Sequence, residues 1–247
     1  MSKDSIVSGL TNLGLKQGDS VLVHASLTSL GELPDAAKIV TDAFMQVLGQ
    51  EGTLLMPALT YSSVTKDNPV FDVDNSPSCV GGLSEYFRTR TGALRSIHPT
   101  HSVCALGKKA TYFTENHLQD STPVGANSPF FKLKEADGYV LFLGCGLHPN
   151  TSMHGVEELV TPPYLFGKER EYTLRISSIE TLKKSYIPHG FKEYIQRYDR
   201  LLDVLAPEDY RVGKVLEAEV FLLDCRAFWK KAEEALRQDP FYFVDKS

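Results

Sequence analysis

Short apolar runs alternate with amphipathic stretches along the N-terminal part of the chain. Residues 5–13 repeat apolar side chains at helical spacing, and Gly14 follows, as glycine commonly does at a helix C-terminus. Residues 20–24 form a short apolar run with β-branched side chains, which predicts a strand buried on both faces. A polar turn, a helical stretch at 35–48 and a second apolar strand at 53–57 come next. This order predicts a βαβ unit with a parallel sheet.

Later segments continue the pattern less regularly. A further buried strand is predicted at 139–143, and the Pro-, Ser- and Asn-rich stretch before it is too long for a structureless loop. The other predicted elements are helices at 82–90, 191–202 and 225–236 and strands at 102–107, 172–176 and 217–223. Together they predict one α/β domain over residues 1–247, with a mostly parallel central sheet flanked by helices. Residues 164–215 form a candidate lid-like distal subdomain.

Composition restricts the classes of function that fit this fold. Hydrophobic residues make up 42% and charged residues 23% of the chain, as in ordinary globular proteins, and the net charge is −5. The sequence has no basic stripe and no apolar run long enough to cross a bilayer, so neither nucleic acid nor a membrane is an expected partner. Four cysteines without a CxxC pair, and no signal-peptide core, favour a cytoplasmic protein. The oligomeric state stays open, a homodimer included.

Polar groups follow the first predicted strand in the run 24–31. Ligands of open α/β sheets bind outside the carboxyl ends of strands, and hydroxyls with free N–H groups there suit an amide-rich or phosphorylated ligand. An ordinary Ser/Thr-rich turn has the same composition. A second run, 95–102, contains an arginine for phosphate and two histidines, although a solvated loop is the alternative. No carboxylate at metal-ligand spacing accompanies it, so no metal is expected.

A third polar run, 144–158, begins where the strand at 139–143 ends. Asn150 or Thr151 can cap a helix on which His154 and Glu157, three residues apart, share one face. A carboxylate that fixes the tautomer of a histidine commonly prepares a general base. Glu158 is the geometric rival of Glu157, and the alternative is a helix N-terminus with favourable acidic residues.

Two other residues have weaker signals. Asp120 lies in a turn-rich run, 117–129, where it is either a turn former or a member of the site. Cys145 follows the strand at 139–143 and would suit an acyl-thioester mechanism. It lacks a Gly-x-Cys-x-Gly elbow, and a buried free cysteine is often a small apolar filler.

Taken in order, these motifs resemble the antibiotic N-acetyltransferase family, which includes the aminoglycoside 3-N-acetyltransferases. The matching stretches are 23–31, 52–57, 71–78, 82–88, 95–99, 128–129 and 150–157. The resemblance spans residues 5–160 and weakens after Pro163.

The resemblance implies an α/β fold distinct from the common acetyltransferase superfamily, with acetyl-CoA as co-substrate. The residues it implies at coenzyme A are Ser26, Leu27, Thr28, Ser29, Ser78, Arg95, His98 and Ser102. The residues it implies at the acetyl-transfer centre are His154 and Glu157, and Thr151 and Asp120 are the further catalytic candidates. The corresponding mechanism is direct attack of an amine on the thioester, with His154 as general base and Thr151 or nearby N–H groups stabilising the oxyanion. The alternatives are an acyltransferase or hydrolase with a covalent Cys145 intermediate, or a non-catalytic module that binds coenzyme A or an amine.

The distal third departs from the resistance enzymes that this family includes. Those enzymes use acidic residues to hold a polycationic aminoglycoside, whereas Lys183, Lys184 and the stretch 185–190 occupy that region here. The acceptor therefore stays open among aminoglycosides, amino-sugars and related metabolites, and 164–215 is the candidate acceptor-binding lid.

Overall fold

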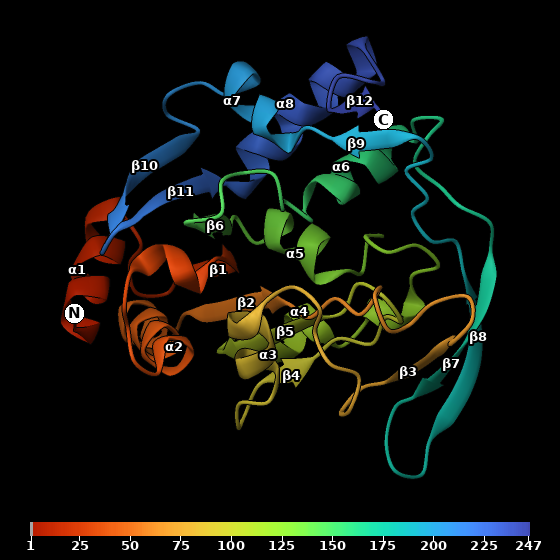
Figure 1. Cartoon of the computed structure of the whole chain (residues 1–247), viewed down its shortest axis with the longest axis horizontal. Helices are drawn as coiled ribbons and strands as arrows, with labels where there is room; N and C mark the ends of the chain where they lie inside the picture. Colours follow the sequence, from red (N-terminus) through yellow and green to blue (C-terminus); the bar gives the residue numbers. More distant parts are fainter. Residues whose placement is uncertain (1) are drawn as a thin grey trace.

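A seven-stranded sheet crosses the middle of the molecule in the computed structural model, which describes residues 2–247 (Figure 1). Its strands, in spatial order, are β10 (Tyr210–Val215), β11 (Ala218–Asp224), β6 (Tyr139–Leu143), β1 (Ser20–Ala25), β2 (Thr53–Pro57), β5 (Val103–Gly107) and β4 (Leu94–Arg95). The predicted strands at 53–57 and 139–143 have these bounds. Only β6, β1 and β2 pair in parallel, and the outer strands are antiparallel. The predicted mostly parallel sheet is therefore correct for its centre and wrong for both edges.

Helices cover both faces of this sheet. One face carries α1 (Lys3–Leu13), α2 (Ala36–Leu48) and α3 (Gly82–Arg88); the other carries α4 (Ala110–Thr114), α5 (Pro129–Glu135), α6 (Met153–Val160) and α8 (Cys225–Gln238). Alternate residues of β1 point to opposite faces, so Val21 and Val23 pack in one core and Leu22 in the other. A sheet covered by helices on both faces requires central strands that are buried on both faces, as predicted for β1.

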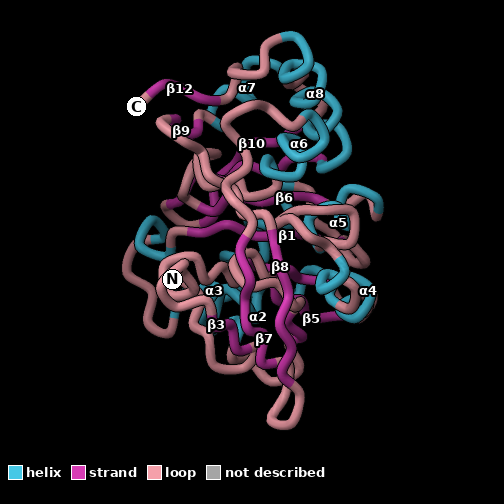
Figure 2. The backbone as a smooth tube through the Cα atoms, turned by 90° about the vertical axis from the view of Figure 1, so that its right-hand side faces the viewer, coloured by secondary structure: helices cyan, strands magenta, loops and turns pink. Residues whose placement is uncertain are grey.

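Two smaller sheets lie beside the central one. β3 (Val70–Asp72), β7 (Arg170–Arg175) and β8 (Thr181–Tyr186) form the first, in which β7 and β8 make a long hairpin (Figures 1 and 2). β9 (Tyr194–Gln196) pairs with β12 (Val244–Lys246) in the second. Residues 164–215 thus contribute strands to all three sheets.

The helix predicted at 191–202 is wrong. Its residues form β9, then a 3-10 turn η3 (Tyr198–Arg200) and the single-turn helix α7 (Leu201–Val204). Phe191 and Glu193 adopt positive φ angles of 42° and 55°, which interrupt a right-handed helix, and β12 supplies the backbone hydrogen bonds instead. Pairing with a distant strand therefore overrides the local helical spacing.

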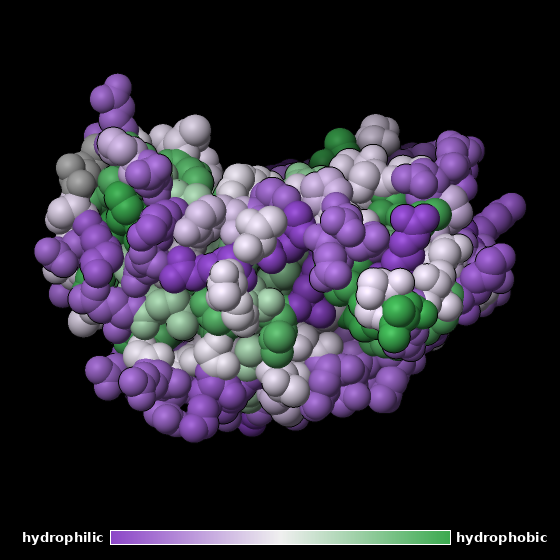
Figure 3. All heavy atoms as spheres, turned by 90° about the horizontal axis from the view of Figure 1, so that it is seen from below, coloured by the Kyte–Doolittle hydropathy of each residue, from purple (hydrophilic) through white to green (hydrophobic). Residues whose placement is uncertain are grey.

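Hydrophobic residues on the face shown in Figure 3 lie in separate patches among polar ones. None of the helices within residues 2–247 is long and apolar enough to cross a bilayer.

The contact between α6 and α8 depends on a glycine. A Cβ added at Gly155 would lie 2.1 Å from Cη2 and 2.7 Å from Cζ2 of Trp229, a buried side chain of α8. No heavy-atom contact of that kind fits between packed side chains, so this position of α6 requires a residue without a Cβ.

We expect Gly155→Ala to lower the free energy of unfolding by about 1–2 kcal/mol in urea titrations. Overpacking against Trp229 costs more than the gain of about 1 kcal/mol in helix propensity. Gly82→Ala is the matched control, because a Cβ there meets nothing within 4 Å. A Gly155→Ala variant as stable as the wild type would contradict the close α6–α8 contact.

Candidate active site

The loop after β6 leads into helix α6 over the carboxyl ends of β1 and β6. Gly144, with φ of 66°, begins this loop, and a Cβ there would lie 1.7 Å from the Ser29 hydroxyl oxygen. The loop therefore lies directly against the turn that follows β1. The Asn150 side-chain oxygen accepts a hydrogen bond from the Ser152 N–H at 3.2 Å, and Ser152 occupies the N-cap of α6. The predicted cap at Asn150 or Thr151 is displaced by one or two residues.

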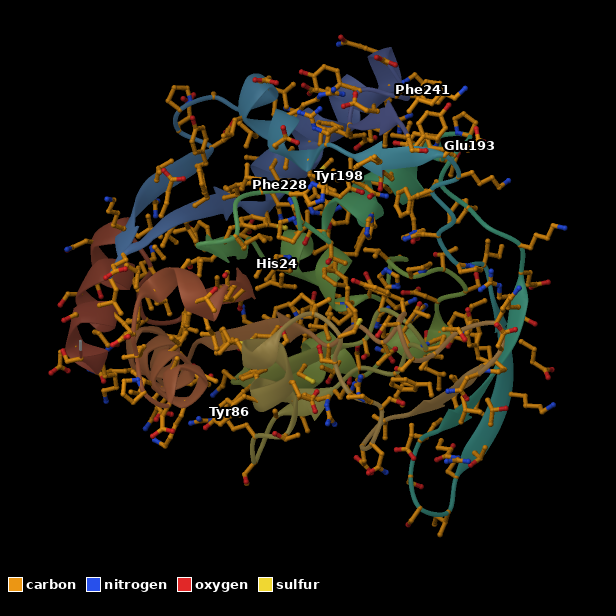
Figure 4. All side chains as sticks on the ribbon, in the orientation of Figure 1. His24, Tyr86, Glu193, Tyr198, Phe228 and Phe241 are labelled. Carbon is orange, nitrogen blue, oxygen red and sulfur yellow. The ribbon has the colours of Figure 1, made fainter. Side chains whose placement is uncertain are left out.

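His154 and Glu157 of α6 form a hydrogen-bonded pair, with Nδ1 of His154 3.1 Å from Oε2 of Glu157. The Glu157 side chain is fully buried. The Tyr164 hydroxyl donates to its Oε1 at 3.1 Å, and the Tyr198 hydroxyl donates to its Oε2 at 2.9 Å while lying 2.9 Å from Nδ1 of His154. Figure 4 shows Tyr198 in the interior near Phe228, whereas Glu193 and Phe241 lie at the outer edge. Hydrogen bonds thus replace the water that the buried carboxylate has lost.

The pair leaves one ring nitrogen of His154 available. Because a carboxylate only accepts, the proton of the neutral ring belongs on Nδ1, and Nε2 keeps a free lone pair. His154 borders a cavity of about 480 Å³. Its other lining residues come from five separate parts of the chain: Leu59, Tyr61, Val80, His101, His148, Pro149, Asn150, Thr151, His189, Phe191, Gln196 and Tyr198. A base, two polar side chains from the α6 loop and an open volume therefore meet in one place.

Two further histidines surround His154. The ring centroids of His101 and His189 lie 5.8 Å and 4.8 Å from that of His154, and 5.4 Å from each other. Burial lowers the pKa of both rings well below its usual value, and repulsion from neighbouring imidazoles acts in the same direction. Both are therefore neutral at physiological pH.

Glu158 does not compete with Glu157 for His154. Its carboxyl group turns the other way, accepting hydrogen bonds from the Val124 N–H at 2.7 Å and the Thr122 hydroxyl at 2.5 Å. Nε2 of His189 lies 2.8 Å from its Oε1. Burial raises the pKa of Glu158 to about 7, although its two hydrogen-bond donors oppose that shift.

The serine-rich turn after β1 keeps the exposure that a ligand site needs. It forms a short 3-10 helix, η1 (Leu27–Leu30), in which the Ser26 and Thr28 hydroxyls lie 3.1 Å apart and Ser29 donates to the Ser26 carbonyl at 2.6 Å. Thr28 is exposed, and Leu27 packs against the core below the turn.

Arg95 and Ser102, predicted at coenzyme A, already have protein partners. The Arg95 guanidinium donates to the Ser102 hydroxyl at 2.9 Å and to the carbonyls of Val73, Ser76 and Ala58 at 3.0, 2.7 and 2.9 Å. Ser102 in turn donates to the Ala58 carbonyl at 2.8 Å. These bonds join three loops, at residues 58, 73–76 and 102, so the geometry favours a structural role over the predicted contact with a phosphate.

His98 and Ser78 are likewise bound within the protein. Nδ1 of the buried His98 accepts from the N–H groups of Thr100 and His101 at 3.2 and 3.0 Å. The half-buried Ser78 donates its N–H to Glu85 at 2.7 Å.

Asp120 and Cys145 lie outside the residues that line the cavity. The Asp120 carboxylate accepts from the backbone and side-chain N–H groups of Asn127, at 3.0 and 2.8 Å, and so closes its own loop. Burial raises the pKa of the Cys145 thiol to about 11, which keeps the nucleophilic thiolate scarce. Neither geometry favours a role in chemistry.

The sequence patterns did not identify Tyr164, Tyr198, His189 or the amide of Asn150 as site residues. The first three lie beyond Pro163, where the motif resemblance weakens. A buried tyrosine or histidine has no local signature, because its role depends on which distant carboxylate it meets. His101 was visible only as a member of the polar run 95–102.

The chain is similar in sequence to aminoglycoside acetyltransferases. A family model described as aminoglycoside 3-N-acetyltransferase matches residues 22–237. The SPbeta prophage-derived aminoglycoside N(3')-acetyltransferase-like protein YokD of Bacillus subtilis is 31% identical over 92% of this chain and 87% of its own length. Aminoglycoside N(3)-acetyltransferase VII of Streptomyces paromomycinus is 31% identical over 66% of this chain, and the match spans 62% of that relative.

Solved structures of such enzymes have a similar fold. AAC-IIIb in binary complex with CoASH has a TM-score of 0.85 at 30% identity, covering 96% of this chain and 97% of that chain. A histidine-to-alanine mutant of AAC(3)-IVa in complex with a gentamicin has a TM-score of 0.81 at 29% identity, covering 98% and 90%. These similarities confirm the predicted α/β fold class and the resemblance drawn from the sequence motifs.

The raised pKa of Glu158 predicts a pH-dependent stability. Between pH 4.5, the ordinary pKa, and about pH 7, the folded protein keeps a proton that the unfolded chain has lost. Stability therefore falls as pH rises through this window. We expect the free energy of unfolding of the wild type, relative to Glu158→Gln, to fall by about 2 kcal/mol from about pH 5 to about pH 8. Urea titrations at both pH values measure it.

Glu180→Gln, at an exposed position, is the control for this measurement and should show no such difference. A constant difference between wild type and Glu158→Gln across the window would show that Glu158 titrates normally.

Proposed function

Because this chain belongs to the aminoglycoside 3-N-acetyltransferase family and is therefore an acetyltransferase, we propose that it transfers the acetyl group of acetyl-CoA to a primary amine of a small polar molecule. The acceptor class comprises aminoglycosides, amino-sugars and related metabolites. The observation that carries the proposal is the His154–Glu157 pair, whose imidazole borders the cavity while its carboxylate is buried.

His154 acts as the general base in this proposal. An amine attacks a thioester only when neutral, yet its ordinary pKa keeps it protonated near pH 7. The ammonium group first loses one proton to solvent. Nε2 of His154 then takes a second proton from the neutral amine as the N–C bond forms, and the C–S bond breaks. The leaving thiolate receives that proton from the imidazolium, which Glu157 stabilises meanwhile through Nδ1. The products are the amide and free coenzyme A, with no covalent enzyme intermediate.

Two groups at the start of α6 suit the oxyanion that forms during this attack. Thr151 is one of the residues that line the cavity, and its hydroxyl is the first of these groups. The buried Nδ2 of Asn150 has no hydrogen-bond partner among residues 2–247 and also belongs to a lining residue. A preorganised donor without a competing partner is what stabilisation of a developing negative charge requires.

Coenzyme A is proposed to lie along the turn after β1. This turn carries the hydroxyls of Ser26, Thr28 and Ser29, with Leu27 packed on the core, and its Ser29 adjoins the loop at Gly144 that leads to α6. The pantetheine arm carries amides that such hydroxyls and N–H groups can bind. This assignment leaves Arg95, His98, Ser102 and Ser78 in supporting positions.

The acceptor side of the cavity is built by the distal segment 164–215. His189, Phe191, Gln196 and Tyr198 contribute to the lining from it. No Asp or Glu is among the lining residues within the described chain, 2–247. The two lysines of the distal segment are engaged elsewhere: Lys183 pairs with Glu171 at 2.9 Å, and Lys184 donates to the carbonyls of Leu118 and Asp120. An aromatic and amide lining suits a sugar bearing one reacting amine better than a cluster of cationic groups.

We expect His154→Ala to lower kcat by about 10²–10⁴-fold while leaving acetyl-CoA binding within a few-fold. Glu157→Gln should lose activity in the same direction, because its amide no longer fixes the tautomer of His154. Release of free coenzyme A in the presence of aminoglycosides, amino-sugars and simple amines measures turnover.

Cys145→Ser is the control that separates direct transfer from a covalent route, and it should keep turnover close to that of the wild type. A loss as large as in His154→Ala, together with a trapped acyl-enzyme, would favour a Cys145 intermediate. Acetyl-CoA binding without turnover across the whole amine panel would favour a non-catalytic binding module.

The charge of the cavity lining also predicts how kcat/KM for an acceptor depends on ionic strength. We expect kcat/KM for any aminoglycoside accepted to change less than about threefold between low and moderate salt, since exposed carboxylates that would attract a polycation are not part of the lining. Parallel assays with a mono-amino sugar provide the reference. Tight, saturable binding of kanamycin-like compounds that weakens steeply with salt would overturn the preference for a single amine.

A further inference from the structure

Three imidazoles converge at the base of the cavity. One ring nitrogen from each of His101, His154 and His189 lies within 4.8 Å of the other two. All three residues line the same cavity, so the space between their rings opens to it. The side chains of His154 and His189 are only 14% and 4% exposed. The cluster is therefore assembled in the interior by helix α6, which carries His154, and by two loops far apart in sequence, which carry His101 and His189.

Each imidazole has one nitrogen held by a polar neighbour. The Thr100 hydroxyl lies 2.9 Å from Nδ1 of His101, Glu157 and Tyr198 hold Nδ1 of His154, and Glu158 holds Nε2 of His189. Metal-binding histidines nearly always have such a partner on the second nitrogen, which fixes the tautomer and the orientation of the ring.

The remaining nitrogens are available to a ligand. Nδ1 of His189 is buried and has no hydrogen-bond partner within residues 2–247. An orphaned buried nitrogen carries a desolvation cost that a bound ligand can remove. Together with the convergence of one nitrogen from each of the three rings, it points to an occupant rather than to simple packing.

We propose that His101, His154 and His189 bind one divalent transition-metal ion, of which Zn²⁺ is the representative. Three neutral imidazoles with an open fourth position toward a cavity form the donor set of a tetrahedral zinc site. Zn–N bonds of about 2.0–2.1 Å place ligand nitrogens about 3.4 Å apart, so the rings turn inward on binding. The buried carboxylate of Glu157, which is hydrogen-bonded to His154, compensates part of the added charge. Oxygen-preferring Mg²⁺ and Ca²⁺ do not suit this set.

Metal binding has a consequence that rests on the function proposed above. The lone pair of His154 that would ligate the ion is the one that accepts the amine proton. A bound ion therefore removes the base, and Zn²⁺ inhibits acetyl transfer reversibly. The metal ion binds the lone pair of the catalytic base and therefore inhibits catalysis instead of assisting it.

The test uses the full-length, untagged protein after treatment with EDTA. Titration with Co²⁺ should produce the intense visible absorption of four-coordinate cobalt at one equivalent per chain, and Zn²⁺ should displace it. Isothermal titration with Zn²⁺ gives the affinity directly. Neither readout depends on turnover, so the metal site can be tested even if the proposed acetyl transfer is not observed.

Variants locate the site. His101→Gln and His189→Gln should each weaken Zn²⁺ binding by more than about tenfold, and Glu158→Gln by about tenfold through the lost outer partner. His148→Gln is the matched control, because His148 lines the same cavity outside the cluster and should leave affinity unchanged. Circular dichroism establishes that each variant is folded.

The outcomes separate the two claims. An octahedral, pale Co²⁺ spectrum, or equal Zn²⁺ affinity in wild type and both ligand variants, would overturn the site. A four-coordinate spectrum in an active enzyme that Zn²⁺ does not inhibit would overturn only the link to the base. Inhibition that EDTA reverses, and that requires about tenfold more Zn²⁺ in His189→Gln, would support both.

Discussion

The buried carboxylate of Glu157 is the group on which the organisation of this site depends. A charge without solvent contact is stable only where hydrogen bonds replace water. Glu157 receives them from Tyr164, Tyr198 and His154. The two tyrosines belong to the segment after α6, so the same bonds that satisfy the carboxylate also dock that segment against the helix. Orientation of the imidazole and closure of the distal side of the cavity therefore have one physical origin.

The surroundings of this group favour neutral imidazoles. Burial lowers the pKa of His101 and His189, and a third ring nearby makes an additional positive charge still more costly. A neutral imidazole can accept a proton, and it can equally ligate a metal ion, because both use the same lone pair. The proposed base and the proposed metal site are thus two uses of one local environment, and they exclude each other.

Much of the fold could be predicted from the chain because periodicity is local. Apolar runs predicted β2 and β6 with their bounds, and the pattern of β1 indicated a strand covered on both faces. The failures have a common cause. The segment 191–202 has helical spacing but pairs with β12, and the outer strands joined the sheet in antiparallel directions. Arg95 was predicted to bind a phosphate, because the sequence around an arginine does not show whether its guanidinium meets a phosphate or, as here, three carbonyl groups.

The sequence by itself determined the α/β class, the family resemblance and the His154–Glu157 pair, since three residues on one helix are neighbours whatever surrounds them. Only the tertiary structure decided that Tyr198, 41 positions from Glu157, completes that pair, that Glu158 turns toward His189, and that three histidines share one space. Such contacts are fixed by how sheets and helices pack, and that packing depends on all the buried side chains together. No local spacing encodes it, which is why the distal side of the cavity emerged from the fold alone.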